Sequence, residues 1–172
     1  MAVEKPETTR MEVAVDEHFI REHQRMIFSL CYRMTGSVPD AEDLTQETFI
    51  TAHQEMETFR GKSKVSSWLY RIGMNRCLNW KKRRERQQKL HEQWGDHREL
   101  SAEIDGDKEG RVQEALMQLS IDERAAVILV IYEGLKHSEA AAALGCAETT
   151  VSWRLFQARR KLKALLGKAE RQ

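Results

Sequence analysis

Apolar side chains recur every three or four residues along most of this chain, which is the period of an amphipathic α-helix. Residues 16–34 follow this spacing, and Gly36 interrupts it. Ser37 then stands as the N-cap of a second predicted helix that ends near Glu57. A longer third helix is predicted over residues 65–88. The first half of the chain is therefore expected to be a small helical bundle.

The helical period is lost over residues 89–110, which contain three glycines, many acids and little apolar pattern. We interpret this segment as a flexible linker. The period returns at Arg111 in a short helix, and Ser120 resembles the start of a capping box for a further helix over residues 121–133. An Ala-rich helix that ends at Gly145 follows.

The last predicted helix, within residues 146–166, has two contrasting faces. On a helical wheel one narrow arc is apolar and consists of Val151, Leu155, Ala158, Leu162 and Leu165. The other side combines a hydroxyl, two aromatic rings, an amide and bases, which are groups that contact base edges and phosphates: Thr149, Ser152, Trp153, Phe156, Gln157, Arg160 and Lys163. With the preceding short helix and glycine turn, this order is that of a helix-turn-helix. A basic helix that is merely solvated is the alternative interpretation.

The third predicted helix has a second polar stripe, formed by Trp68, Arg71, Asn75, Asn79 and Lys82. Asparagine is a poor helix former, so two asparagines on one face need an explanation. Asparagine can pair with an adenine edge and tryptophan can stack on an unpaired base, which indicates contact with nucleic acid. Ordinary exposed polar positions, with Trp68 in the core, remain the alternative.

The net charge of +1 conceals strong segregation of charge. Residues 37–59 hold six acids and neither Lys nor Arg, whereas residues 60–90 hold eleven bases and one acid. Residues 151–172 are again basic, with seven bases and one acid. The two basic blocks predict two contacts with phosphate. The acidic block predicts a surface that contacts a partner other than phosphate.

Several classes of protein are disfavoured. No run of eighteen apolar residues is present, so we expect no membrane insertion and a cytoplasmic location. Cys31, Cys77 and Cys146 are odd in number and form no CxxC pair, so we expect reduced thiols, with Cys31 and Cys77 buried and inert. We expect no metal, no cofactor and no enzymatic activity, because the chain has no phosphate-binding glycine motif, clustered metal ligands or paired carboxylates in an apolar setting.

Three segments resemble bacterial RNA polymerase sigma factors, and the two-block layout is similar to that of the extracytoplasmic-function (ECF) class. They are DAEDLTQETF at residues 40–49, TFRGKSKVSSWLYRIGMNRCLNW at residues 58–80, and the stretch over residues 119–162. The resemblance implies an all-α fold with two small helical domains joined by a flexible linker. Residues 1–15 would be an N-terminal tail, 16–88 sigma region 2, 89–110 the linker and 111–172 sigma region 4.

The resemblance also implies partners and site residues. Core RNA polymerase would be bound through its β′ coiled coil and β flap, with promoter DNA and an anti-sigma factor as further partners. The polymerase-docking residues would be Asp40, Asp43, Gln46 and Glu47. The −10 element would meet Arg60, Lys62, Ser63, Lys64, Trp68, Arg71, Asn75 and Asn79. The −35 element would meet Thr149, Ser152, Trp153, Phe156, Gln157 and Arg160.

The expected function is promoter recognition and strand opening for core polymerase. A stand-alone helix-turn-helix regulator that binds duplex DNA as a dimer is the first alternative, although it leaves the second basic block unexplained. A protein-interaction module, such as an anti-sigma mimic, is the second, and the basic blocks argue against it.

Overall fold

The computed structural model describes residues 14–59, 61, 63–94 and 108–169. Within these ranges the secondary structure is helical, without a strand. The elements are α1 (Glu17–Thr35), α2 (Val38–Glu55), the 3₁₀ turn η1 (Met56–Thr58), α3 (Val65–Trp94), α4 (Lys108–Met117), α5 (Ile121–Val127), the π-helical turn η2 (Ile128–Tyr132), α6 (His137–Leu144) and α7 (Glu148–Ala169). The expectation of an all-α fold is confirmed.

Local signals in the sequence place most helix ends. The Asp16 carboxylate accepts a hydrogen bond from the Phe19 N–H at 2.8 Å and caps α1. Gly36 then adopts a φ of 70°, in the left-handed region that glycine enters at little cost, so the chain can turn into α2. The predicted capping box at Ser120 is present, with both reciprocal hydrogen bonds to Glu123. These ends follow from neighbouring residues alone.

Three helices differ from their predicted bounds. α4 begins at Lys108, three residues before the predicted return of the helical period at Arg111 and inside the segment predicted as a linker. α3 continues to Trp94, because the residues after position 80 are mostly strong helix formers and the first helix breaker is Gly95. The helix expected over residues 121–133 changes to a π-helical turn at Ile128, where the Glu133 N–H donates to the Ile128 carbonyl at 3.0 Å. The wider turn ends at Glu133, whose side chain contacts the first half of the chain.

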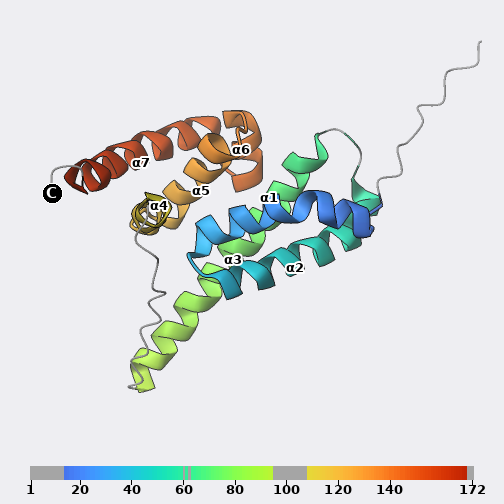
Figure 1. The fold of residues 1–172 in the computed structure, drawn as a ribbon, viewed down its shortest axis with the longest axis horizontal. Helices are drawn as coiled ribbons and strands as arrows, with labels where there is room; N and C mark the ends of the chain where they lie inside the picture. The colour runs from blue at the N-terminus through green and yellow to red at the C-terminus, as the bar shows by residue number, and fades with distance from the viewer. Residues whose placement is uncertain (1–13, 60, 62, 95–107, 170–172) are drawn as a thin grey trace, which may run out of the picture.

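Helices α1, α2 and α3 form one bundle, and the C-terminal part of α3 projects beyond it (Figure 1). The bundle core holds fully buried side chains from all three helices, including Ile27, Leu30, Leu44, Leu69 and Met74. Gly73 lets α1 and α3 approach closely, because a Cβ at this position would lie 3.3 Å from Leu30 Cδ2. Burial of these apolar surfaces is the main stabilising contribution.

Helices α4 to α7 pack together on the other side of α1 and α3 (Figure 1). Their core contains Leu116, Ile128, Leu129, Val151 and Leu155, and it is continuous with the core of the first bundle. The apolar arc predicted for α7 is buried at its first three positions, whereas Leu162 is half-buried and Leu165 is 39% exposed. The two halves thus share one hydrophobic core.

Buried polar groups also join the two halves. Arg124 of α5 is only 5% exposed, and its guanidinium donates hydrogen bonds to the carbonyls of Met34, Leu116, Met117 and Leu119. These acceptors lie at or just beyond the C-terminal ends of α1 and α4, where helix carbonyls lack partners within the helix and carry partial negative charge. The Gln113 side chain adds hydrogen bonds to two carbonyls of α1.

The cysteine arrangement is partly as expected. Cys31 and Cys77 are both fully buried, as predicted, and their sulfur atoms lie 3.7 Å apart between α1 and α3. The hydrogen bond with Cys31, together with burial, raises the pKa of the Cys77 thiol. The expectation that they are chemically inert stays a prediction. Among the described helices, none combines the length and apolar character needed to cross a membrane.

Candidate nucleic-acid and protein interfaces

The polar stripe predicted on α3 lines a pocket. Trp68, Arg71, Asn75 and Asn79 border a hollow of about 530 Å³ between the end of α2 and the N-terminal half of α3. Ser63, from the segment before α3, also lies in its wall. Arg71, Asn75 and Asn79 are exposed, and Trp68 is half-buried and packs against the core, so the alternative of ordinary exposed polar positions beside a core Trp68 stays open.

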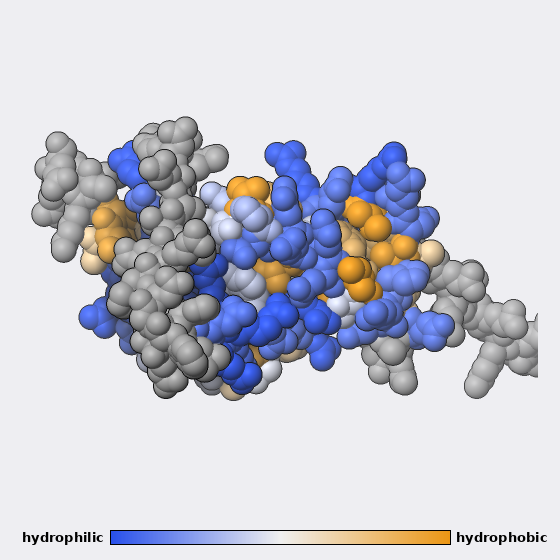
Figure 2. Space-filling view, turned by 90° about the horizontal axis from the view of Figure 1, so that it is seen from below, coloured by the Kyte–Doolittle hydropathy of each residue, from blue (hydrophilic) through white to orange (hydrophobic). Residues whose placement is uncertain are grey.

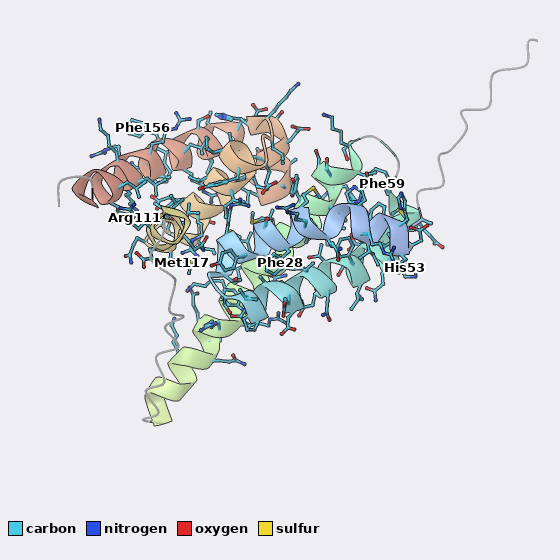
Figure 3. All side chains as sticks on the ribbon, viewed as in Figure 1. Phe28, His53, Phe59, Arg111, Met117 and Phe156 are labelled. Atoms are coloured by element: carbon cyan, nitrogen blue, oxygen red, sulfur yellow. The ribbon has the colours of Figure 1, made fainter. Side chains whose placement is uncertain are left out.

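An aromatic pair lines this pocket. The rings of Phe59 and Trp68 lie 5.0 Å apart at an interplanar angle of 41°. Figure 3 places Phe59 at the end of the segment that leaves α2. The pocket combines aromatic surface, side-chain amides and a guanidinium group, which can stack on a base, pair with its edge and contact phosphate.

Other residues of the pocket were not among the predicted contacts. Thr51, Glu55, Phe59, Ile72 and Arg76 line it as well. Thr51 and Glu55 of α2, and Phe59 just after η1, come next to α3 only through packing of the bundle, so spacing along one helix could not reveal them. Of the predicted loop residues, Ser63 and Lys64 are exposed, whereas Arg60 and Lys62 lie outside the described residues.

The outer face of α7 exposes the aromatic residues predicted to read duplex DNA. Trp153 is 60% and Phe156 is 58% exposed, and Phe156 lies on the outer side of α7 in Figure 3. The Arg160 guanidinium lies 5.9 Å from the centre of the Phe156 ring. Thr149 is exposed and Gln157 half-buried on the same helix. The helix therefore offers apolar, polar and charged groups together.

Ser152 differs from its neighbours on α7. Its hydroxyl donates to the Glu148 carbonyl at 3.1 Å and lies 3.0 Å from His137 Nδ1 of α6. The hydroxyl thus helps to join the two helices of the helix-turn-helix. A direct contact between Ser152 and DNA would have to compete with these hydrogen bonds.

The predicted docking residues of α2 fall into two groups. Asp43 and Gln46 are exposed, and beside them Ile50 is 59% exposed. Asp40 and Glu47 instead face α3, where Asp40 accepts hydrogen bonds from Trp80 Nε1 and Arg84 Nη1, both at 3.2 Å. The Glu47 carboxylate lies 3.6 Å from Arg83 Nη2. Asp40 is the third residue of α2, yet its side chain turns to α3 rather than back to Ser37.

Hydrophobic groups reach the surface on the side of the molecule shown in Figure 2, where they gather mainly toward the right, over the end of the bundle formed by α1 and α2. On α2, exposed Ile50 occurs together with exposed Asp43 and Gln46. A surface that mixes exposed apolar and acidic groups in this way is suited to binding a basic protein partner. Across the parts of the chain that the structure describes, no group of three His, Cys, Asp or Glu side chains is arranged to hold a metal ion.

Comparison with known families gives two matches in chain order. Residues 19–87 match the family model of sigma-70 region 2, and residues 109–162 match that of sigma-70 region 4. The first match contains the α3 pocket, and the second contains the helix-turn-helix, with α7 included as far as Leu162.

Similar proteins agree with these matches. The chain is 36% identical over 159 residues to the ECF RNA polymerase sigma factor SigM of Mycobacterium tuberculosis, covering 90% of this chain and 78% of the relative. It is 30% identical over 161 residues to the RNA polymerase sigma-H factor of Pseudomonas aeruginosa, covering 86% of this chain and 83% of that one.

Two solved structures are also similar. The sigma factor RpoE of Bartonella quintana, in complex with the anti-sigma factor NepR, is 27% identical, with a TM-score of 0.72 and coverage of 87% of this chain and 95% of that one. CnrH, in complex with the cytosolic domain of CnrY, is also 27% identical, with a TM-score of 0.63 and coverage of 88% and 86%. The chain belongs to the ECF RNA polymerase sigma factors, the family of non-enzymatic subunits that direct RNA polymerase to promoters.

Proposed function

We propose that this sigma factor uses three separate surfaces in transcription initiation. The α3 pocket captures unpaired bases of the −10 element, the outer face of α7 reads the −35 duplex, and α2 docks on the β′ coiled coil of core polymerase. The observation that carries the proposal is the pocket itself, in which the aromatic pair Phe59 and Trp68 lies beside Asn75 and Arg71.

The pocket is suited to single-stranded rather than duplex DNA. A base that has left the stack exposes both faces and its pairing edge, so Trp68 can stack on it while Asn75 and Asn79 bind its edge. Exposed Ser63 and Lys64 lie at the entrance to α3, and Arg60 and Lys62 belong to the same proposed loop. Strand opening then needs no fuel, because binding of the captured bases offsets the few kcal/mol that unpairing costs.

The α7 surface is suited to a major groove. Its exposed groups are Trp153, Phe156, Arg160 and Thr149, with Gln157 at the edge and Ser152 held to α6. The aromatic rings can contact thymine methyl groups, and Arg160 can meet a phosphate or a guanine edge. The short preceding helix α6 then lies across the DNA backbone, as in other helix-turn-helix proteins.

The α2 surface is proposed to bind protein, because DNA would repel its carboxylates. Asp43 and Gln46 form the centre of the docking surface, and Asp40 and Glu47 form its edge toward α3. We place region 2 in residues 16–88 and region 4 in residues 111–172, with residues 1–15 as a tail and 89–110 as the connection. The matches at 19–87 and 109–162 support this division.

Further partners follow from the same function. We propose that region 4 also contacts the β flap of the polymerase and that an anti-sigma factor controls the chain, because the RpoE relative has been solved with one. The chain then acts in the cytoplasm, where core polymerase and promoter DNA are found.

The direct test is run-off transcription with purified core polymerase, with and without this chain, on a library of candidate promoters. Transcripts that start at defined positions only when the chain is present are the expected result. Binding of the chain to specific duplex DNA as a dimer, without any stimulation of core polymerase, would instead support the stand-alone regulator.

The base-capture step has its own test. Asn75→Ala should slow opening of a duplex promoter, and part of this defect should remain on a template with a pre-melted −10 bubble, because base capture itself is impaired. Glu57→Ala, at an exposed position outside the pocket lining, is the matched control. Full activity of Asn75→Ala on both templates would remove this residue from the proposed site.

A further inference from the structure

A second hollow adjoins the base pocket on α3. It has a volume of about 330 Å³ and is lined by Glu47, Arg76, Asn79, Lys82, Arg83 and Arg86. Arg76 and Asn79 also line the base pocket, so the two hollows are neighbours along α3. Their lining residues on α3 extend from Trp68 to Arg86, toward the C-terminal part of the helix that projects beyond the bundle in Figure 1.

The second hollow has the chemistry of a phosphate site. Four of its six lining residues are cationic, and three of these are arginines, whose planar forks bind phosphate oxygens in pairs. Lys82, Arg83 and Arg86 are exposed, so their charges are accessible to a large ligand. From Arg76 to Arg86 the helix rises by about 15 Å, which corresponds to roughly four base-pair steps of DNA.

One residue of the hollow has the opposite charge. Glu47 of α2 lies 3.6 Å from Arg83 Nη2, and the two side chains are 39% and 58% exposed. An ion pair with this exposure is weak, so a phosphate can displace the carboxylate from Arg83. The same Glu47 belongs to the edge of the proposed polymerase-docking surface.

We propose that this hollow binds backbone phosphates of the DNA that enters the base pocket, and that Glu47 competes with phosphate for Arg83 in the free chain. This inference rests on the proposed function for the source of the DNA. Asp43 lies one helical turn before Glu47, so a basic surface of the polymerase that binds α2 would also attract Glu47. Docking would then release Arg83 for DNA, and the two binding events would strengthen each other.

The first experiment uses the full chain alone and a duplex DNA without promoter sequence, with affinity measured by fluorescence anisotropy at several salt concentrations. Glu47→Gln should bind about threefold more tightly than the unaltered chain, and its salt dependence should be steeper by up to about 0.9 units. Arg83→Gln should bind more weakly and with a shallower dependence. In the double variant the Glu47→Gln gain should disappear, because the competing pair no longer exists.

Glu42→Gln is the matched control, because it removes the same charge from an exposed position of α2 that does not line the hollow. Equal gains from Glu42→Gln and Glu47→Gln would show that net charge alone acts and would overturn the role of Glu47. Unchanged binding by Arg83→Gln and by Lys82→Gln would overturn the phosphate site. Circular dichroism melting curves identify any variant that fails to fold. If either Arg83→Gln or Lys82→Gln fails to fold, the other variant tests the phosphate site.

The second experiment tests the link to the polymerase. With core polymerase at saturating concentration, the difference in promoter affinity between Glu47→Gln and the unaltered chain should narrow to within about twofold. A threefold difference that persists would show that docking on the polymerase does not release Arg83 from Glu47. Failure of the proposed function is distinguishable, because run-off transcription would then be absent while binding of the free chain to duplex DNA still responded to Glu47→Gln.

Discussion

The hydroxyl of Tyr70 on α3 donates a hydrogen bond to the carboxylate of Glu133, which ends the π-helical turn in the second half of the chain. The same carboxylate lies 3.7 Å from Arg33 Nη1 of α1. Arg33 in turn lies over the ring of Tyr132, 4.4 Å from its centre. Glu133 therefore connects two helices of region 2 to region 4 at a half-buried position.

Replacement of Tyr70 by Phe tests this connection. Burial raises the pKa of Tyr70 well above its ordinary value of 10.0, and the hydrogen bond to Glu133 adds to this effect. At neutral pH, Tyr70→Phe should lower the free energy of unfolding by about 1–2 kcal/mol, because a hydrogen bond to a charged acceptor is lost.

The stability difference between the unaltered chain and Tyr70→Phe should depend on pH. A raised pKa in the folded state means that the stabilising contribution is fully present below pH 10 and is lost as the pH rises above it. In urea unfolding between pH 8 and 11, the difference between the unaltered chain and Tyr70→Phe should thus shrink at the alkaline end. A difference that stays constant would show that Tyr70 keeps no special proton affinity.

Arg124 should be among the most sensitive positions of the fold. Arg124→Met keeps most of the side-chain volume but leaves the four carbonyls at Met34, Leu116, Met117 and Leu119 without this donor. We expect a loss of about 2–4 kcal/mol in the free energy of unfolding, measured in urea. Arg111→Met, at an exposed position of α4, should change it by less than about 0.5 kcal/mol. Equal effects would contradict the role of the buried guanidinium.

Glu123 should make the stability of region 4 sensitive to acid. Burial alone would raise the pKa of this carboxyl, but hydrogen bonds from Lys161 and from Ser120 outweigh it and hold the pKa below its ordinary value of 4.5. The carboxylate therefore stabilises the folded state above pH 4.5, and this contribution is lost as the pH falls below it.

The substitution Glu123→Gln reads out this contribution. At pH 7 it should cost about 1–2 kcal/mol, because the capping box and the ion pair with Lys161 are weakened together. Thermal melts from pH 7 to pH 3 should show the two proteins converging in acid. Asp122→Asn, whose carboxylate is 54% exposed beside Arg154, should show a smaller change.

The two ends of the α7 surface should affect DNA binding differently. Trp153→Ala should weaken binding of the holoenzyme to its preferred upstream sequence by roughly 1–3 kcal/mol and affect scrambled DNA less, because the exposed ring meets base edges. Arg160→Ala should weaken both similarly and reduce the salt slope by about one unit. Footprinting on matched and scrambled promoters measures this difference. Unaltered sequence preference in Trp153→Ala would assign the ring to packing instead.

The thiols should differ in reactivity. Cys31 and Cys77 are fully buried and Cys146 is half-buried, so a thiol reagent should modify Cys146 first in the native chain. The other two should react only at the rate of unfolding, which stopped-flow experiments with and without urea can show. Rapid labelling of all three native thiols would overturn the expectation that the buried pair is inert.

Local sequence determined the helices and most of their ends. Caps at Asp16, Gly36, Ser120 and Gly145 act over three or four residues, so neighbouring side chains suffice to predict them. The stripe from Trp68 to Asn79 and the exposed face of α7 also follow from helical period alone, because residues on one helix keep their relative directions wherever the helix packs.

Only the tertiary structure decided which residues of other helices pack against these helix faces. Phe59 and Thr51 entered the α3 pocket, and Asp40 and Glu47 turned to the bases of α3, through the packing of α2 against α3. Contacts between Tyr70 and Glu133 join residues far apart in the chain, and no spacing rule relates such positions. The helical period in the sequence determines in which direction each side chain points around its own helix axis. Which side chains meet across two helices depends instead on how side-chain volumes fill a shared core.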